Sequence, residues 1–499
     1  MSQSYGATED TPLMAGLPGV PRLNARGAKK LQMAGASCSV ALVFMLMLVG
    51  AHWIDSGDRA WQDRTAACKG LRVRGNHTNE QGDALLWRIA GCAGAKFAKV
   101  TKLGDSTQGR PILALSLDWC PAGANCPALL LKANIHGDET SGRELLLRYV
   151  ATLVKNEVSR PGVLRRLRLV VVPCVNPDGF HLRRRENAKG VDLNRNFPIK
   201  RVGMKKGDSD AETNIGKADP SRQPEVDAVM KATNALGPFV AATTLHGGGL
   251  LCNYPWDDAA NGNSAAFSKA SGVSGNIPGG NHTPSQTADE FSFKALCGAY
   301  AGGNNAMARE NGVDGSKPLQ KVAGVHGGVV NGAAWYAVSG GSQDWTYLAH
   351  GTLAVTLELG PLKSPAASQL DAIYEENRDA LRRLLDFAVH GTAVHGKVTS
   401  VDGGIAVSGA VVCARSSGAA GGALDRPCTT TRADGTYWRL LGPGSYTVTA
   451  WSNGSEASRL NAKVGRAGGD ALPQIQLPAG GDAKRLEWKG PAFYKLVKK

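Results

Sequence analysis

His136 and Glu139 are the first residues in the sequence whose types and spacing could do metal chemistry. They follow the apolar run 128–134, which is typical of a buried strand. A His and a Glu three residues apart can both reach one metal ion if the chain turns from strand into helix between them. His246, which follows the strand-like run 239–244, offers a third ligand. Two His and one Glu are a common catalytic zinc set, because they leave a position open for water, although either His alone is usually structural.

Strand-like and helix-like segments alternate between residues 76 and 390. The alternation predicts an α/β domain with a largely parallel or mixed sheet. The reactive residues come just after apolar strands, where open α/β sheets commonly place their sites. Over residues 391–480 the segments are short, alternate in polarity and are separated by turns such as Asp434-Gly435, which predicts a small β-sandwich. Residues 481–499 form a basic tail.

Five further motifs follow in order along the chain. They are Asn176-Pro-Asp-Gly-Phe180, the run from Arg185 to Pro198, Asn253-Tyr-Pro-Trp-Asp257, the run from Trp335 to Trp345, and Thr356-Leu-Glu358. Together with His136-Gly-Asp-Glu139, this order closely resembles the zinc metallocarboxypeptidases, and the nearest branch resembles the regulatory carboxypeptidases, the D, E, N and M group. The resemblance implies an α/β fold with a mixed eight-stranded-type sheet flanked by helices, followed by a small all-β transthyretin-like sandwich.

The same resemblance implies a zinc exopeptidase that binds one Zn²⁺ per chain through His136, Glu139 and His246. Asp192 matches the carboxylate that orients a ligand histidine. Glu358 matches the general base, which takes a proton from the metal-bound water and delivers it to the leaving amine. Without the resemblance, Glu358 in its apolar strand would be interpreted as an outward, solvated residue.

Arg185 matches the group that stabilises the oxyanion of the tetrahedral intermediate, although a solvated basic turn is the alternative for residues 183–185. Asn194 and Arg195 match the clamp for the substrate's terminal carboxylate, which a guanidinium recognises at two points. Tyr336 matches the mobile tyrosine that closes over the bound end of the peptide. Because the clamp needs a free terminal carboxylate, the enzyme would be an exopeptidase.

Asp257 and Gln343 match the polar pocket of the branch that removes C-terminal Lys or Arg. A carboxylate in a partly dry pocket would pair with a cationic side chain and penalise an acidic one, so basic peptide or protein C-termini are the expected substrates. A surface aspartate is the alternative interpretation of Asp257. Two further alternatives stay open: a non-catalytic peptide-binding relative, and an active enzyme that prefers aliphatic or acidic ends.

The net charge of +15, from 57 Lys and Arg against 42 Asp and Glu, first suggests a nucleic-acid binder. The basic residues are scattered, however, and the sequence contains no basic helix, zinc-finger spacing or aromatic RNA-binding run. We therefore expect no nucleic-acid partner. A serine hydrolase is a poor alternative, because no Gly-x-Ser-x-Gly motif occurs.

The N-terminal part of the chain carries an apolar run at residues 33–54, which follows a basic stretch and is long enough to span a bilayer. Basic residues before the run place the N-terminus in the cytosol. We expect a cytosolic tail at 1–30, a transmembrane signal anchor at 31–54 and a linker at 55–75. This predicts a single-pass type II membrane protein of the secretory or endolysosomal system or the cell surface. Secretion after cleavage of a signal peptide is the alternative.

Ten cysteines agree with an oxidising compartment. Four pairs are candidate disulfides, of which the first two bracket short loops: Cys120–Cys126, Cys413–Cys428, Cys68–Cys92 and Cys252–Cys297. If Cys38 lies in the membrane, nine cysteines remain outside it, so at least one is unpaired. Three glycosylation sequons fit lumenal exposure; they lie at Asn76, Asn281 and Asn453.

Overall fold

The structure is a computed structural model of the 499-residue chain. It describes residues 68–160, 162–199, 221–258, 284–310, 313–314, 317–318, 326–417, 426–452, 458–465, 470–471, 475–477, 486–488 and 494–496. The predicted tail and anchor at 1–54, and the sequons at Asn281 and Asn453, lie outside these residues. Asn76 is described and exposed. Within the described part of the chain, no helix combines the length and the apolarity that a membrane span needs.

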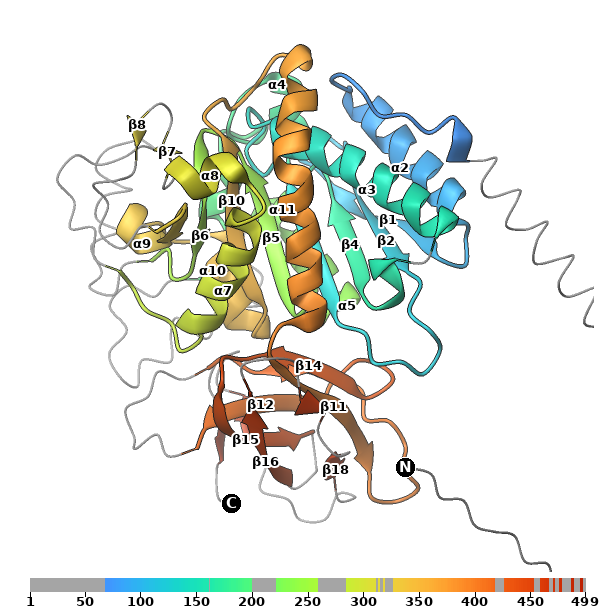
Figure 1. The fold of residues 1–499 in the computed structure, drawn as a ribbon, viewed down its shortest axis with the longest axis vertical. Coiled ribbons are helices and arrows are strands. Elements are labelled where there is room, and N and C mark those ends of the chain that lie inside the picture. The colour runs from blue at the N-terminus through green and yellow to red at the C-terminus, as the bar shows by residue number, and fades with distance from the viewer. Residues whose placement is uncertain are drawn as a thin grey trace, which may run out of the picture. The chain divides into compact units, whose positions relative to one another are not determined.

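The larger part of the described chain is built on one mixed sheet of ten strands (Figure 1). The strands are β1 (Ala98–Asp105), β2 (Pro111–Asp118), β3 (Ala128–Ala133), β4 (Arg168–Val172), β5 (Ala241–His246), β6 (Gly249–Tyr254), β7 (Val313–Asp314), β8 (Lys317–Pro318), β9 (Val329–Asn331) and β10 (Leu353–Gly360). Their order is β1-β2-β4-β3-β5-β10-β6-β7-β8, and β9 pairs with β6. The central strands β4, β3, β5 and β10 are mutually parallel, and β2 and β6 join them antiparallel. The predicted mixed sheet is confirmed, and two two-residue strands, β7 and β8, extend the expected eight.

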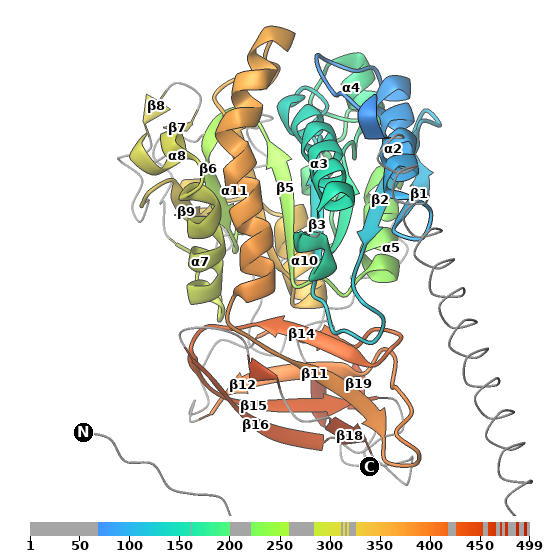
Figure 2. The ribbon, with the colours of Figure 1, turned by 45° about the vertical axis from the view of Figure 1, so that its right-hand side comes forward.

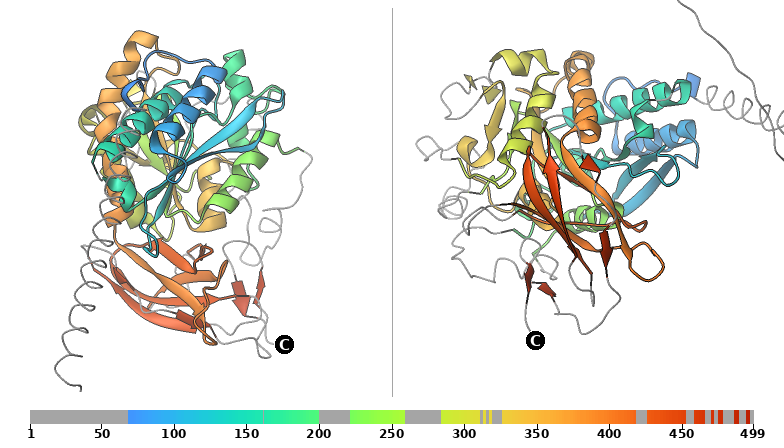
Figure 3. Two further views of the ribbon diagram at one scale, coloured as in Figure 1. Left: turned by 90° about the vertical axis from the view of Figure 1, so that its right-hand side faces the viewer. Right: turned by 60° about the horizontal axis from the view of Figure 1, so that its bottom comes forward.

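Helices cover both faces of this sheet (Figures 1 and 3). They are α2 (Asn79–Ala93), α3 (Ser141–Ser159), α4 (Pro177–Leu182), α5 (Pro224–Leu236), α7 (Glu290–Ala301), α8 (Asn305–Glu310), α9 (Gly332–Trp335), α10 (Ser342–His350) and α11 (Leu370–His390). Every residue of β3 and of β5 is buried, as expected for central parallel strands between two helical layers. In α11 the buried residues recur at helical spacing, so one stripe faces the sheet: Asn377, Ala380, Leu381, Leu384, Leu385 and Ala388.

The strands that follow α11 form an all-β region (Figure 2). This region has its own cluster of buried apolar side chains. The strands are β11 (Ala393–Ser400), β12 (Val411–Ser416), β13 (Thr429–Thr430), β14 (Thr436–Leu440), β15 (Gly444–Trp451), β16 (Ser458–Val464), β17 (Asp470–Ala471) and β18 (Ile475–Leu477). They make two four-stranded sheets, whose apolar side chains share one buried cluster. The predicted turn at Asp434-Gly435 is present: Gly435 has a φ of +76°, which favours glycine. A further hairpin joins β19 (Leu486–Trp488) to β20 (Tyr494–Leu496).

Among the described residues, four disulfides link eight cysteines, and all four candidate pairs are confirmed. They are Cys68–Cys92, Cys120–Cys126, Cys252–Cys297 and Cys413–Cys428. Cys174 is the free cysteine among the described residues, and burial raises the pKa of its thiol to about 12. A raised pKa disfavours the thiolate, which is the nucleophilic form of cysteine.

Candidate active site

Two parallel strands of the sheet bring the three predicted metal ligands together. His136 and Glu139 lie in the connection between β3 and α3, and His246 is the last residue of β5. Ala133 pairs with Leu245 across these strands, so the residues that follow β3 come next to the end of β5. The strand itself extends through His246, two residues beyond the end that its sequence predicts.

The side chains of His136, Glu139 and His246 converge in the interior of the molecule. The Nδ1 atom of His136 lies 3.0 Å from Glu139 Oε1, and Nδ1 of His246 lies 2.7 Å from Glu139 Oε2. One ligand atom of each residue lies within 4.8 Å of the others, and all three residues are buried. Two imidazole nitrogens and a carboxylate oxygen are the donors that a catalytic zinc ion takes. The donor set therefore fits a zinc ion.

Asn134 and Gly137 shape the turn that carries His136 and Glu139. Asn134 adopts a left-handed φ of +56°, and its Nδ2 donates to the carbonyls of His136 at 2.8 Å and Glu139 at 3.1 Å. An Asn tolerates this conformation because its short polar side chain bonds the local backbone. At Gly137 a Cβ atom would lie 2.0 Å from the backbone of Gly179 in α4, so only glycine fits. The turn thus fixes the direction of both ligands.

Asp192 lies behind His136, where the resemblance expects it. Its Oδ1 is 3.2 Å from His136 Nε2, and its Oδ2 accepts a hydrogen bond from Arg185 Nε at 3.0 Å. Burial opposes ionisation, but His136 and Arg185 hold the pKa of Asp192 well below its ordinary value. Burial also lowers the pKa of His136, but the Glu139 and Asp192 carboxylates outweigh it and the pKa is raised. A carboxylate bonded to Nε2 fixes the ring and leaves Nδ1 for a metal ion.

Arg185 reaches the same cluster from the segment that follows α4. Its Nη1 lies 3.1 Å from His136 Nδ1 and 3.4 Å from Glu139 Oε1. Of its neighbours, Arg183 is exposed, and Arg184 donates to the carbonyl of Asn187. Of the three arginines at 183–185, Arg185 is therefore the one whose charge acts at the metal-ligand cluster, and a solvated turn describes Arg183.

Glu358 stands beside His246 on the neighbouring strand. β10 pairs with β5 in parallel, and Glu358 is directly opposite His246 in the register. Glu358 is 6% exposed, so it is not the outward, solvated residue that its strand position alone suggests. Tyr336 follows α9, and the charges of Arg195, Glu358 and Arg185 act on its hydroxyl. Burial raises the pKa of Tyr336, so the phenol stays protonated as a hydrogen-bond donor.

Asn194 and Arg195 lie in a single 3₁₀ turn, Leu193–Arg195, which Asp192 caps by accepting from Asn194 N at 2.9 Å. The Oδ1 atom of Asn194 accepts from Ser342 N at 2.9 Å, which ties this turn to the start of α10. That bond uses the amide oxygen and leaves the Nδ2 donor of Asn194 for a ligand. The Arg195 guanidinium lies 3.8 Å from Asp192 Oδ2 and is partly exposed. The turn can therefore present an amide donor and a guanidinium to an anion.

Asp257 and Gln343 form a buried pair at the other end of the site. Gln343 Nε2 donates to Asp257 Oδ1 at 2.5 Å, and Gln343 Oε1 accepts from Thr356 Oγ1 at 2.8 Å. Asp257 is 6% exposed, which contradicts its interpretation as a surface residue. The Asp344 carboxylate accepts from the backbone N–H of Asp257 at 3.0 Å. Burial and the neighbouring Asp344 raise the pKa of Asp257 well above its ordinary value.

The sequence motifs assigned no role to Asp344 or Lys132. The Asp344 carboxylate accepts hydrogen bonds from the backbone N–H groups of Asp257 and Asp258. Nothing in the sequence around Asp344 distinguishes it from an ordinary helix residue. Lys132 in β3 is buried, and its Nζ donates to Ser342 Oγ at 2.7 Å. Burial lowers the pKa of Lys132 to about 7. Its signal was available, because it is a single charge inside an apolar run.

The comparison with known proteins agrees with this geometry. The zinc carboxypeptidase family profile matches residues 93–380. Carboxypeptidase SOL1 of Arabidopsis thaliana is 32% identical over 376 residues, which cover 74% of this chain and 66% of that protein. Carboxypeptidase E of Caenorhabditis elegans is 31% identical over 420 residues, covering 78% and 83%. The chain therefore belongs to the zinc carboxypeptidase family.

Human carboxypeptidase D is 31% identical over 382 residues, which cover 74% of this chain but 24% of that protein. The chain thus spans about two thirds of SOL1 and about a quarter of carboxypeptidase D. Similarity to carboxypeptidases D and E is consistent with the regulatory branch. Among solved structures, thrombin activatable fibrinolysis inhibitor matches with a TM-score of 0.48 and 17% identity, over 66% of this chain and 80% of that one.

Proposed function

We propose that this protein is a zinc-dependent carboxypeptidase that hydrolyses the C-terminal peptide bond and releases C-terminal Lys or Arg from peptides or proteins. The observation that carries the proposal is the buried His136–Glu139–His246 cluster, with Glu358 opposite His246 in the sheet. A donor set that fits zinc, next to a carboxylate that is not part of it, is what metal-assisted hydrolysis needs.

The zinc ion would be held by His136, Glu139 and His246, and it would supply Lewis acidity toward a carbonyl oxygen and a more acidic bound water. Glu358 accepts the proton of the attacking water and passes it to the amine that leaves. Arg185 offsets the negative charge that develops on the carbonyl oxygen. These roles need each residue near the scissile bond. Glu358 lies opposite His246 in the sheet, and Arg185 Nη1 lies 3.4 Å from Glu139 Oε1, which supports both roles.

Recognition of the substrate's end falls to the residues around α10. The Nδ2 donor of Asn194 and the guanidinium of Arg195 bind the terminal carboxylate, and Tyr336 donates its hydroxyl to the same end of the peptide. Asp257 faces the last side chain. Ionising a buried carboxylate is costly unless a cation pairs with it, so a cationic side chain is favoured over an aliphatic or acidic one.

We also propose where the protein is located and which class of domain its all-β region belongs to. The apolar run at 31–54 would anchor the chain in a membrane with its catalytic part in the lumen or outside the cell, or would be cleaved before secretion. Four disulfides support an oxidising compartment. The all-β region is proposed to be a transthyretin-like domain, which its two small sheets and single core support.

Mass spectrometry of matched peptides ending in Arg, Lys, Leu or Glu tests the proposal. The full chain, purified with zinc, should release Arg and Lys fastest, and a chelator should stop the release. Release of Leu or Glu at the same rate would refute the basic preference. Zinc-loaded protein that binds these peptides without cleaving them would favour a non-catalytic relative.

A further inference from the structure

A buried network connects the all-β region to the substrate pocket. At its centre is Asp289, the residue that directly precedes α7. Its side chain is 1% exposed. Its Oδ1 accepts from Arg426 Nε at 2.9 Å, and its Oδ2 accepts from Arg439 Nη2 at 2.5 Å. Both arginines belong to the all-β region, where Arg439 lies in β14. Two guanidinium groups thus hold one carboxylate of the α/β part in place.

The same carboxylate holds a residue of α10. Tyr347 donates its hydroxyl to Asp289 Oδ2 at 2.8 Å and is fully buried. Tyr347 lies one helical turn after Gln343 and Asp344, on the same face of α10, because residues three and four apart in a helix are neighbours. Its position along α10 therefore moves with that of both pocket residues.

Tyr347 also supports the other wall of the pocket. Its ring centroid lies 5.0 Å from that of Trp256, which directly precedes Asp257 in the chain. One side chain therefore contacts the segment that carries Asp257 and lies on the helix that carries Gln343. The hydrogen bond between Gln343 and Asp257 therefore depends on the positions of α10 and of the segment after β6.

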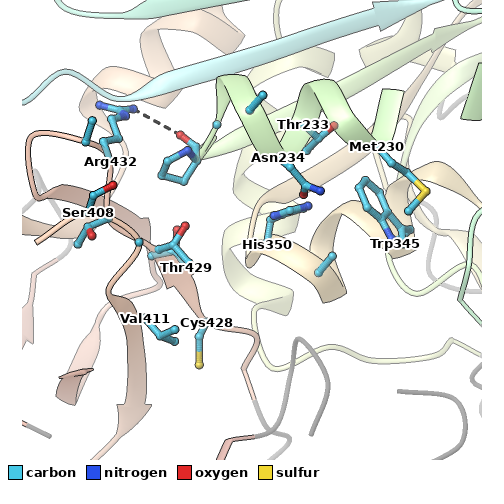
Figure 4. Close-up of a pocket in the computed structure, with 18 residues that line it drawn as sticks. Met230, Thr233, Asn234, Trp345, His350, Ser408, Val411, Cys428, Thr429 and Arg432 are labelled. Carbon is cyan, nitrogen blue, oxygen red and sulfur yellow. Dashed lines mark hydrogen bonds between the residues drawn. The ribbon is translucent and has the colours of Figure 1, made fainter. Parts of the chain in front are cut away.

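Another flank of α10 borders a cavity. A space of about 600 Å³ is lined by Trp345 and His350 of α10 on one side and by Thr429 and Arg432 of the all-β region on the other (Figure 4). This space is partly open to solvent and lies between that flank of α10 and the all-β region. The contact through Asp289 is a direct link between the two parts on the other side of the helix.

We propose that Asp289 and Tyr347 are positioning residues for the selectivity of the enzyme, through which the all-β region fixes the distance between Gln343 and Asp257. The inference rests on the proposed preference for basic C-terminal residues. Neither residue touches substrate; loss of the network lets α10 shift and loosens the pocket. The result is a weaker preference for Arg, seen mainly as a higher KM, with the hydrolytic groups at Glu358 unchanged.

The test compares two tyrosines that each make one buried hydrogen bond. Tyr347→Phe removes the bond to Asp289 and keeps the ring on Trp256. Tyr300→Phe, the matched control, removes a 2.6 Å bond from a fully buried tyrosine of α7 to Asn377. We expect Tyr347→Phe to lower the ratio of kcat/KM for Arg-ending over Leu-ending peptides about fivefold, the scale of one buried hydrogen bond. Tyr300→Phe should leave the ratio unchanged, even where both variants lower Tm.

Arg439→Lys and Arg439→Met extend the test to the all-β region. The Met variant should lower the ratio as Tyr347→Phe does, and the Lys variant, which keeps a cation, should restore part of it. If Arg439→Met does not fold, Tyr347→Phe and the Lys variant still decide. An unchanged ratio in Tyr347→Phe, or an equal fall in Tyr300→Phe, would overturn the inference while the wild-type preference stands. A wild-type enzyme with no preference for Arg would overturn the proposed function and the inference together.

Discussion

At the residue scale, the site contains several carboxylates with different roles. The neighbours of each carboxylate determine its protonation state and therefore its role. Asp192 is paired with cations and held ionised, whereas Asp257 is buried beside Asp344 and has a raised pKa. Glu358 stands apart from both, next to His246. The same functional group thus orients a ligand, recognises a substrate and moves a proton, according to its neighbours.

Glu358→Gln tests the proton-transfer role. The amide keeps the size of the side chain but cannot take a proton from water, so kcat should fall by about 100- to 10,000-fold. Zinc content, measured by atomic spectroscopy, should stay at one per chain, because Glu358 is not among the proposed ligands. Glu157→Gln, a buried glutamate that bonds backbone N–H groups after α3, should keep wild-type activity. A fully active Glu358→Gln would assign the base to another residue.

Asp257→Asn tests the recognition role. Loss of the negative charge should lower kcat/KM for Arg-ending peptides about 10- to 100-fold, with little change for Leu-ending peptides. Asp178→Asn is the control: Asp178 is also buried, but its side chain pairs with Ser106 and Arg110 of the connection between β1 and β2 and not with Asp257 or Gln343. It should lower Tm and leave the preference intact. An unchanged preference for Arg-ending peptides in Asp257→Asn would show that Asp257 is not the residue that recognises the basic side chain.

At the element scale, the pocket lies between α10 and the segment after β6. Because Asp344 of α10 lies close to Asp257, we expect substrate selectivity to depend on pH. Burial and Asp344 raise the pKa of Asp257, so the carboxyl is neutral below that pKa and charged above it. A cationic side chain prefers the charged form. The ratio of kcat/KM for Arg-ending over Leu-ending peptides should therefore rise with pH, and Asp257→Asn should flatten the profile. A ratio that falls with rising pH in the wild type contradicts this account.

Lys132 of β3 gives a second prediction, on stability. Burial lowers the pKa of Lys132 from its ordinary value of 10.5 to about 7 in the folded protein, so the unfolded state binds more protons between these pH values. Unfolding free energy should therefore rise with pH from about 7 to 10 on account of this residue, and the full cost of burying the cation applies below pH 7. Lys132→Met should stabilise the protein by about 2 kcal/mol at pH 6 and remove that rise.

Denaturant unfolding at pH 6 and pH 9 measures both effects. Lys102→Met is the control, at a half-exposed lysine paired with Asp105. It should change the unfolding free energy by no more than about 0.5 kcal/mol at either pH. A Lys132→Met variant that is less stable than wild type at pH 6 would show that the bond to Ser342 outweighs the cost of burying the charge.

At the scale of the whole molecule, short-range patterns predicted more than long-range ones. The mixed sheet, the strand after which His136 comes and the Asp434-Gly435 turn follow from local periodicity and turn chemistry. The disulfide between Cys120 and Cys126 also follows from proximity in the chain. The network of Asp289 with Arg439 joins residues 150 positions apart, and neither residue type nor spacing points to it. The burial of Asp257 and Glu358 likewise arises from packing by distant helices, which no local pattern contains.

The central claim, zinc-dependent release of a C-terminal residue, is tested most directly with one peptide in two forms. The peptide ends in Arg, either as the free acid or as the amide, and is incubated with the full chain before chelation, after it, and after zinc is added back. Mass spectrometry should show loss of one Arg from the free acid alone, no loss after chelation, and recovery with zinc. Zinc-loaded protein that leaves the free acid intact, or that cleaves the amide as fast, would contradict the account.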